Sequence, residues 1–536
     1  MRLSRKLVLL GIFFLVVLIN IRIGKVIMGF DNSSPFFSFS ATWYRIFSTN
    51  NFFHYGGMLF TPALWLSLLS LPAWLNSYLT YFGAFIIGMF FSSLLIIERE
   101  SDDKTNWAIG KVVLILLGSL IPIWMFSIPI LIFAPSFAGV TALLYFLLWT
   151  PSKGERENIL VWLLLLLGLL YFYSTSINVA AFTLYFVETI ILALILKPKQ
   201  LSISIITKKA VAVALVWLAI VQVILILRPH PPFVLTEALH YGRELAQDAK
   251  SAEVTSSLIE METQRNSIVN VARFATGWLS LTDGQEKNLS SYKNYIDSIP
   301  GIIITLAPAF LICYFLFSQW KKQTVATRNL AVAWGVAIFL CTSYALIFTQ
   351  TIPYVGVILR WVSSKLWPLL FFPSIILLYK ALSAETVQKT AKNIVYIGLG
   401  ITALPWLFGI VNKHQQVSFP TYYTDAIAQF TENDSVLYLP EPQRLYMRQY
   451  NWGYYGSSFL TYLTNAKILD NGSFHPEQNI YPALTDDYKN CNVTSLKRAI
   501  SVIVIDNSTI AGTISLPSCY DTFTKTQVGD LTIIRL

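Results

Sequence analysis

Long apolar runs dominate this chain and limit what it can fold into. A bilayer core about 30 Å thick is crossed by about 20 mostly apolar residues in an α-helix, and eleven segments reach or approach that length. They are Leu7–Ile23, Leu79–Ile97, Val112–Phe133, Ser136–Trp149, Ile159–Ser174, Ile177–Leu196, Ala210–Leu227, Ile302–Trp320, Leu330–Phe348, Leu366–Tyr379 and Ile394–Val411. We therefore expect a polytopic α-helical membrane protein with about 11 transmembrane helices.

Composition excludes two other classes of protein. Charged residues make up 13% of the chain, against roughly 25% in soluble globular proteins, and 55% of the residues are hydrophobic, whereas disordered chains are poor in hydrophobic residues. The net charge of +10 would suggest a nucleic-acid partner in a soluble protein. Here the basic residues flank apolar runs, so we expect membrane lipids and no nucleic acid as partners.

The distribution of basic residues predicts the orientation. If Met58–Trp74, a twelfth apolar segment with two prolines, stays at the interface, eighteen Lys and Arg residues lie on one side of the membrane. The short connections on the other side carry five, namely Arg22, Lys25, Arg45, Arg360 and Lys365. The positive-inside rule then predicts a cytoplasmic N-terminus and an extracytoplasmic C-terminus in the cell (inner) membrane. A membrane span at Met58–Trp74 would reverse the predicted orientation of every span that follows it.

This topology divides the chain into two predicted domains. Residues 1–411 form a transmembrane domain with external loops 24–78 and 228–300, and residues 412–536 form an extracytoplasmic α/β domain. In the tail, TYYTDAIAQFTEN reads as a helix before the strand DSVLYLP, and SLKRAI as a helix before SVIVID. A closing hairpin leads from DTFTKTQVGD into LTIIRL. Alternating helices and strands favour a parallel core. Cys491 and Cys519 lie in this tail, and a disulfide between them requires an oxidising compartment.

Asp31 is the acidic residue that follows the first span, in GFDNSSPFF. A carboxylate at the membrane face is placed to meet a lipid-borne substrate. Asp31 or Asn32 can equally cap a short helix that begins near Pro35, because Asp, Asn and Ser before Pro are ordinary helix start signals. Both interpretations remain open on the sequence alone.

Arg360 and Lys365 lie before a late span, in LRWVSSKLWP. A buried cation costs roughly 2.5–3.5 kcal/mol at the bilayer centre on insertion scales, so both should lie at the interface or in a polar cavity. An Arg and a Lys together suit a phosphate or pyrophosphate. The alternative is that both side chains extend to lipid headgroups, as basic residues at helix ends often do.

Aromatic residues cluster in the tail, in QYNWGYYGSSFL. Trp452, Tyr454 and Tyr455 are candidates to bind a ligand with apolar faces by stacking on it. The alternative is that they pack inside the protein, because clustered aromatics are usually buried. For metals, His54 has no second histidine or carboxylate at ligand spacing, so the sequence indicates no metal site.

Several of these motifs resemble the GT-C superfamily of integral membrane glycosyltransferases, and most nearly its arabinofuranosyltransferase-like and YfhO-like branches. The resemblance rests on the Asp after the first span, on WYRIF, HYGG and FTPALWLSLLSLPAWLNSYL before the second, and on the Arg-x4-Lys element of Arg360 and Lys365. The tail pieces DSVLYLP, NWGYYGSSFL, LKRAISVIVID and GDLTIIRL are also similar to the external domains that often end such proteins.

The resemblance implies transfer of a sugar, with inversion, from a polyprenyl-phosphate donor to a glycan, lipid or protein acceptor outside the cytoplasm. Asp31 would be the catalytic base, and Arg360 and Lys365 would bind the donor phosphate. Trp452, Tyr454 and Tyr455 would be candidates to bind the acceptor by stacking on its sugar rings. No cofactor besides the lipid-linked sugar is expected, and no second acid pairs with Asp31 to support a divalent metal. Two other classes remain: a transporter or flippase of lipid-linked saccharides, and a non-catalytic assembly factor.

Overall fold

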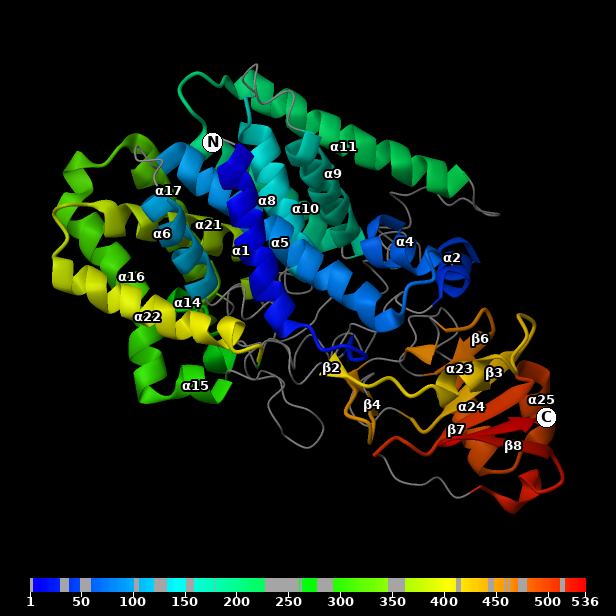
Figure 1. Ribbon diagram of the computed structural model, residues 1–536. Coiled ribbons are helices and arrows are strands. Elements are labelled where there is room, and N and C mark those ends of the chain that lie inside the picture. The colour runs from blue at the N-terminus through cyan, green and yellow to red at the C-terminus, as the bar shows by residue number, and fades with distance from the viewer. Residues whose placement is uncertain are drawn as a thin grey trace.

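The structure, a computed structural model, describes residues 3–28, 38–48, 59–100, 106–119, 133–150, 159–177, 179–226, 260, 263–276, 293–345, 362–410, 416–441, 448–456, 459–460, 463–470, 480–510 and 516–536. Figure 1 shows a bundle of helices and, beside one end of it, a domain built around a sheet. The C-terminus lies in that domain, and the N-terminus lies at the far end of the bundle.

Each of the eleven expected spans overlaps one apolar helix of the bundle. These helices are α1 (Leu3–Asn20), α5 (Ala73–Glu100), α6 (Asn106–Gly118), α8 (Phe133–Leu148), α9 (Ile159–Ser174), α10 (Val179–Leu196), α11 (Ile203–Ile226), α16 (Ile299–Gln319), α17 (Val325–Leu340), α21 (Trp367–Ser383) and α22 (Lys389–Leu407). By length and composition, three of the described segments suffice to cross a membrane, Ala73–Glu98, Ile203–Val223 and Ile299–Lys322. The number of spans therefore stays a prediction.

The segment Met58–Trp74 does not form one long helix. Its described part holds α4 (Pro62–Leu68), which at 1.5 Å per residue is about 10 Å long, a third of the bilayer core. Ser70 then adopts a positive φ of 54°, and α5 begins at Ala73. The Asn76 side chain donates a hydrogen bond to the carbonyl of Ala63 at 2.8 Å, which holds α4 against the start of α5. A helix of this length cannot span the membrane.

Three lysines mark one end of the bundle, called here the lysine end. Lys6 at the start of α1 lies 4.0 Å from Glu98 near the end of α5. Lys111 in α6 donates to Ser383 at the end of α21 at 3.1 Å, and Lys209 in α11 donates to the carbonyl of Phe146 in α8 at 2.7 Å. All three belong to the larger group of basic residues that the charge count assigns to one side.

The opposite end, called here the tail end, is where α1 stops. Asn20 donates to the carbonyl of Trp406 near the end of α22 at 2.8 Å, and Gln416 donates to the carbonyl of Asn20 at 3.0 Å. The short strand β1 (Val26–Ile27) pairs antiparallel with β2 (Gln416–Val417). The beginning of the first external loop is therefore joined to the beginning of the tail. Helix α2 (Phe39–Ser48) lies beside α4 in Figure 1.

The tail is built on a five-stranded sheet of order β6-β3-β7-β9-β8. Its strands are β3 (Ser435–Leu439), β6 (Lys467–Leu469), β7 (Val502–Asp506), β8 (Thr524–Val528) and β9 (Leu531–Arg535). Strand β3 pairs in parallel with β6 and with the central strand β7, and β9 pairs antiparallel with β7 and β8. The parallel core and closing hairpin expected from the sequence are confirmed, while β6 is an additional strand.

The two faces of this sheet enter different cores. Successive side chains of a strand point to opposite faces, and Leu437 and Ile503 belong to a cluster covered by α24 (Tyr481–Lys489) and α25 (Val493–Ala499). Val436 and Val504 point the other way, into a core that is continuous with the helical bundle. Helix α23 (Tyr422–Ile427) lies on that side. The tail therefore has a core of its own and also shares one with the bundle.

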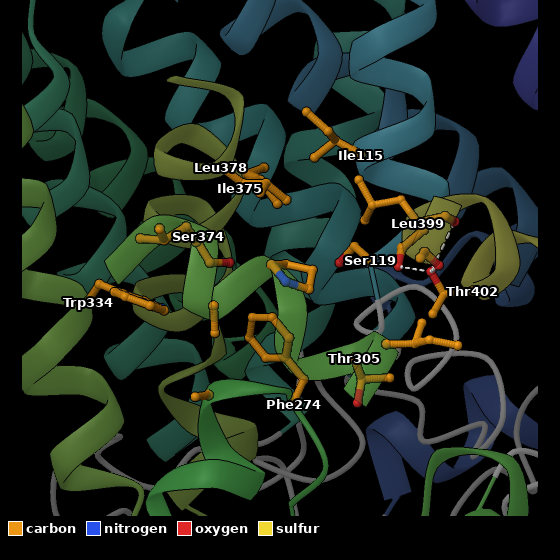
Figure 2. A pocket seen from close by; sticks show the side chains of 17 residues that line it. Ile115, Ser119, Phe274, Thr305, Trp334, Ser374, Ile375, Leu378, Leu399 and Thr402 are labelled. Atoms are coloured by element: carbon orange, nitrogen blue, oxygen red, sulfur yellow. Dashed lines mark hydrogen bonds between the residues drawn. The ribbon is translucent and has the colours of Figure 1, made fainter. Parts of the chain in front are cut away.

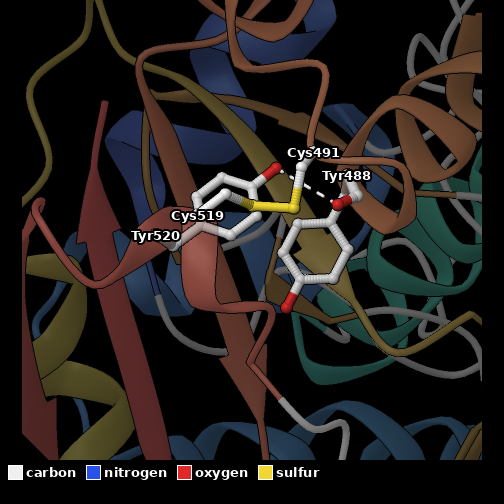
Figure 3. Close-up of a disulfide and its surroundings, with 4 residues drawn as sticks. All are labelled: Tyr488, Cys491, Cys519 and Tyr520. Carbon is white, nitrogen blue, oxygen red and sulfur yellow. Dashed lines mark hydrogen bonds between the residues drawn. A yellow bond between two sulfur atoms is a disulfide. The ribbon is translucent and has the colours of Figure 1, made fainter.

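A disulfide joins Cys491 to Cys519 across 28 residues, with their Cα atoms 5.9 Å apart. It links the turn after α24 to the segment before β8. Beside it the rings of Tyr488 and Tyr520 stack with centroids 5.0 Å apart, and the Tyr520 hydroxyl donates to the Tyr488 carbonyl at 3.3 Å (Figure 3). The pairing that the sequence left open is thus present, and it is typical of a domain in an oxidising compartment.

Candidate functional site

Of the three charged residues expected to carry the chemistry, the structure describes Lys365. Asp31 and Arg360 lie outside the described residues. Before Asp31, the chain is described as far as Met28, which is buried and follows the strand β1 at the tail end. The site is therefore built outward from Lys365.

Lys365 is the last residue of α20 (Val362–Lys365), a single turn whose four residues are all buried. The lysine itself is 5% exposed. A side chain that extends to lipid headgroups leaves its charged end in water, so this burial disfavours the headgroup alternative for Lys365. Covering an ammonium group with protein is costly unless polar groups face it. Ser363 and Ser364, both 4% exposed, belong to the same turn.

Helix α10 holds the chain on both sides of Lys365. The hydroxyl of Tyr185 donates to the carbonyl of Ser364 at 2.9 Å. One turn along α10, Glu188 accepts a hydrogen bond from the backbone N–H of Leu369 at 3.4 Å. Leu369 is the third residue of α21, where backbone N–H groups have no partner within the helix. The Glu188 carboxyl group thus caps α21 from outside, and α10 fixes the α20–α21 break that carries the lysine.

Two buried polar atoms next to this break have no hydrogen-bond partner among the described residues. One is Oε1 of Glu188, a residue 3% exposed, and the other is Nε1 of Trp367. The rings of Tyr185 and Trp367 lie 6.1 Å apart, so both atoms belong to one neighbourhood. An acidic side chain inside a membrane helix is costly, and by default it indicates a functional site. We call Tyr185, Glu188, Ser364, Lys365 and Trp367 the buried polar cluster.

Glu188 is not among the residues that the sequence patterns single out. The signal was nevertheless present, because Glu188 is the one charged residue in the apolar run VAAFTLYFVETIILALIL. Its partner, the N–H of Leu369, is 181 positions away, and no spacing in the sequence connects the two. Its significance therefore becomes visible only in three dimensions.

The aromatic residues proposed to bind the acceptor are mostly buried. Tyr454 is fully buried and Tyr455 is 9% exposed. The ring of Trp452, which is half-buried, stacks on that of Tyr454 with centroids 5.3 Å apart, and Phe459 packs edge-on against Tyr454. Buried rings cannot stack on a sugar. The burial of both residues therefore favours the packing alternative for Tyr454 and Tyr455, and the Tyr454 ring is covered by Trp452 and Phe459.

A buried polar network lies under these rings, at the end of β7. Asp506 accepts hydrogen bonds from the hydroxyls of Tyr423 at 2.6 Å and Tyr438 at 2.5 Å, and from the N–H and hydroxyl of Ser508. Burial raises the pKa of Asp506, and these hydrogen bonds oppose that rise. All the hydrogen bonds are internal to the tail, so the network ties α23 to the sheet.

No group of three or more His, Cys, Asp or Glu residues within the described part of the chain is arranged to hold a metal ion. Most of the polar features of the buried polar cluster are hydroxyl, carbonyl and ammonium groups, together with a single carboxyl group. That set suits recognition of a phosphate or a hydroxyl-bearing ligand more than coordination of a cation.

Comparison with known proteins bears on the fold of this chain. The sequence matches no protein-family model and no curated protein. The fold resembles that in the cryo-EM structure of the arabinofuranosyltransferase AftD from Mycobacteria, with a TM-score of 0.57 and 14% identity. The fold is GT-C-like. The likeness covers 100% of this chain and 40% of that chain, so the chain spans less than half of the enzyme it resembles. At 14% identity the comparison supports a similar fold and does not identify a branch of the superfamily.

Proposed function

We propose that this protein is a membrane glycosyltransferase that moves a sugar from a polyprenyl-phosphate donor to a glycan, lipid or protein acceptor outside the cytoplasm. The observation that carries the proposal is the buried Lys365, held in a polar cluster at a helix break. The likeness of the whole chain to an arabinofuranosyltransferase supports it. A cation held away from lipid headgroups has a ready use in binding a phosphate.

In the proposed reaction, the hydroxyl oxygen of the acceptor attacks C1 of the donor sugar and its proton passes to Asp31. The bond from C1 to the phosphate oxygen breaks, and polyprenyl phosphate leaves with the electron pair. Attack from the face opposite the phosphate inverts C1. A carboxylate of ordinary pKa near 4 is a weak base in water, so Asp31 must be held against the acceptor hydroxyl as charge develops.

Lys365, with Arg360, would stabilise the departing phosphate, whose negative charge grows in the transition state. A charged hydrogen-bonding group that is already fixed in place stabilises the transition state more than one that must first reorganise. Tyr185 and Glu188 would supply that fixation, because each bonds to a backbone group within four residues of Lys365. They act through the backbone and are positioning residues in this scheme.

A transporter or flippase of lipid-linked saccharides would also use a buried cation for the phosphate, as would a non-catalytic assembly factor. Neither requires a base that takes a proton from an acceptor. Transfer measured with purified protein and a panel of polyprenyl-phosphate sugars in lipid vesicles therefore tests the proposal. Movement of the donor across the bilayer without formation of any glycoside would support the transporter instead.

In that assay, Lys365→Ala is expected to lower donor affinity or turnover by about tenfold or more, because a hydrogen bond to a charged group contributes about 1.5–3 kcal/mol. The matched control is Lys321→Ala, which removes an exposed lysine after α16 at the lysine end. The control is expected to keep wild-type activity. Equal activity of both variants, with Lys365→Ala folded as judged by its thermal unfolding, would contradict a phosphate contact.

We further propose that the lysine end faces the cytoplasm and that the tail lies outside. The charge count and the Cys491–Cys519 disulfide support this orientation. In a Cys313→Ser background, a cysteine at position 288 is expected to react with a membrane-impermeant maleimide in intact cells. A cysteine at position 323, beyond the other end of α16, is expected to react only after permeabilisation. The reverse pattern would overturn the orientation.

A further inference from the structure

The described part of the bundle offers little interior room for a ligand, whereas its surface carries an uncharged apolar patch. Figure 2 shows the cavity between α6, α16, α17, α21 and α22, with the ring of Phe274 pointing into it. Its volume of about 40 Å³ is far below the roughly 300–1,000 Å³ of small-molecule sites. Exposed apolar patches mark contacts with proteins or membranes, so the surface is where this part of the chain can bind a partner.

Helix α2 packs on the protein with one side and presents aromatic rings on the other. Ala41 and Ile46 are fully buried, whereas Trp43 is exposed. The Trp43 ring stacks on that of Phe39 with centroids 5.3 Å apart. Trp65 of α4 lies against both rings, with centroids 6.4 Å from Trp43 and 6.1 Å from Phe39. The three rings therefore join α2 to α4 at the surface.

Helix α4 presents apolar side chains outward in the same way. The indole Nε1 of Trp65 donates to the carbonyl of Leu59 at 2.7 Å. The only polar atom of the ring is thus satisfied within the protein, although 47% of the residue is exposed. Leu68 and Leu69, at the end of the helix, are 54% and 67% exposed. We call Trp43, Trp65, Leu68 and Leu69 the apolar patch.

Most of the apolar patch belongs to a stretch of the sequence without charges. No Asp, Glu, Lys or Arg occurs between Arg45 and Glu98, whereas about a quarter of the residues of a soluble domain are charged. A leucine side chain left in water gives up the free energy of its burial, so water is an unfavourable neighbour for this surface. The exposed Leu79 extends the uncharged surface along α5.

The length of α5 places this patch at one boundary of the bilayer core. Near one end of the helix, Glu98 faces Lys6 at the lysine end of the bundle. Along α5, Asn76 lies about 33 Å from Glu98 at 1.5 Å per residue, a distance comparable with the about 30 Å thickness of the bilayer core. Asn76 is the residue that holds α4, through its hydrogen bond to Ala63. Helix α4 therefore lies at the boundary opposite the lysine end.

We propose that the apolar patch inserts into the lipid leaflet at the tail end and anchors α2 and α4 to the membrane. Tryptophan is enriched where headgroups meet acyl chains, and helices bind there through an apolar face buried about 5–10 Å. The acyl chains would cover Leu68 and Leu69, and the two indole rings would lie at the level of the headgroups. The proposal concerns membrane contact and stands whether or not the protein transfers a sugar.

The test uses the full-length protein in lipid nanodiscs with a nitroxide spin label at single positions. Leu68→Cys and Leu69→Cys carry the label in a Cys313→Ser background, in which the free Cys341 stays buried. Both leucines are exposed, so the substitutions leave the packing of the protein intact. Collisions of the label with molecular oxygen, which dissolves among acyl chains, and with a water-soluble nickel chelate then report what surrounds it.

Two exposed positions serve as references for lipid and for water. Phe310→Cys lies midway along α16, and Thr526→Cys lies on β8 of the tail. At both patch positions, the ratio of oxygen to nickel collisions is expected to lie near that at position 310 and well above that at position 526. Frequent nickel collisions would place the patch in water. Rare collisions with both reagents would show that it is covered by protein, a second copy included, and either result would overturn the proposal.

A second variant measures how firmly the patch holds α4. In nanodiscs, Leu68→Ser/Leu69→Ser is expected to raise amide hydrogen exchange in α4 by about tenfold or more, because burial of one leucine side chain shifts an equilibrium by at least about that factor. The matched control, Ile394→Ser/Ile397→Ser, alters two exposed apolar residues of α22 and should leave exchange in α4 as in the wild type. Unchanged exchange in α4 of the leucine variant would reject the anchoring role.

Discussion

Asp31→Asn is expected to lower sugar transfer by about a hundred- to ten-thousand-fold, the usual contribution of a general base. The substitution keeps the size of the side chain and much of its hydrogen bonding but removes its ability to take a proton. Donor binding should change little, because the phosphate contacts are assigned to other residues. The measurement is single-turnover transfer together with equilibrium binding of the donor, both on purified protein in lipid.

The same variant separates the catalytic role from the capping role. Asn is as good a helix N-cap as Asp, so a residue that only caps a helix near Pro35 would tolerate the change with full activity. Asp31→Ala removes the base and the cap together and provides the comparison. If Asn restores the stability lost in Ala but not the activity, Asp31 is the base. Turnover near wild type in Asp31→Asn would reject that assignment.

Hydropathy predicted the positions of the helices well but not their ends. The expected segments began at Leu79 and Ala210, whereas α5 starts at Ala73 and α11 at Ile203. An apolar run identifies the part of a helix that is surrounded by lipid or protein. The backbone hydrogen bonds of the helix continue beyond that run, so the run is shorter than the helix. In α11 they continue through Lys208 and Lys209, whose charges end the apolar run without ending the helix.

In the tail, the longer strands were predictable and the shorter elements were not. Strands β3 and β7 are buried on both faces, and continuous apolar runs such as VIVID are typical of that setting. Strand β6 has three residues and joins the sheet through its pairing with β3, a partner that lies about 30 positions earlier. Local sequence carries little information on such a pairing, because the hydrogen bonds that define it are made with a distant segment.

For the candidate site, the sequence identified residue types and not their surroundings. Lys365 stood out as a cation beside a span, but its burial depends on α10, and Glu188 gains its meaning from a bond to α21. Tyr454 illustrates the opposite case. A tyrosine in a Gly- and Ser-rich segment suggests exposure, and only the packing of Trp452 and Phe459 against it shows that it is covered.

The tail contains a buried ion pair that cannot lose one partner without a large loss of stability. Arg448 is 1% exposed and lies 3.2 Å from Asp470, which is also buried. The arginine donates to the carbonyl of Pro440 at 3.1 Å and lies over the ring of Tyr438 at 4.6 Å. Burial would lower the pKa of Arg448, but Asp470 and the nearby tyrosines raise it. The guanidinium therefore stays charged. Each of the two buried charges is stabilised by the other.

Arg448→Met is expected to destabilise the tail by about 3–5 kcal/mol, because it leaves a carboxylate buried without its cation. The double variant Arg448→Met/Asp470→Leu should recover most of that loss, since a buried pair replaced by apolar side chains of similar size is often neutral. The exposed pair of Lys489 and Glu441 provides a control. There, Lys489→Met should cost no more than about 1 kcal/mol.

Amide hydrogen exchange in the full-length protein measures all three variants and also tests the domain boundary. Arg448→Met should raise the exchange of β3, β6 and β7 together by about a hundredfold or more, since each 1.36 kcal/mol changes an equilibrium tenfold. If residues 412–536 unfold as a unit, protection in α5 and α8 should be unchanged. Faster exchange in those helices as well would show that the core shared through β1 and β2 makes the tail and the bundle one cooperative unit. An unchanged β3 would instead show that the buried pair contributes little.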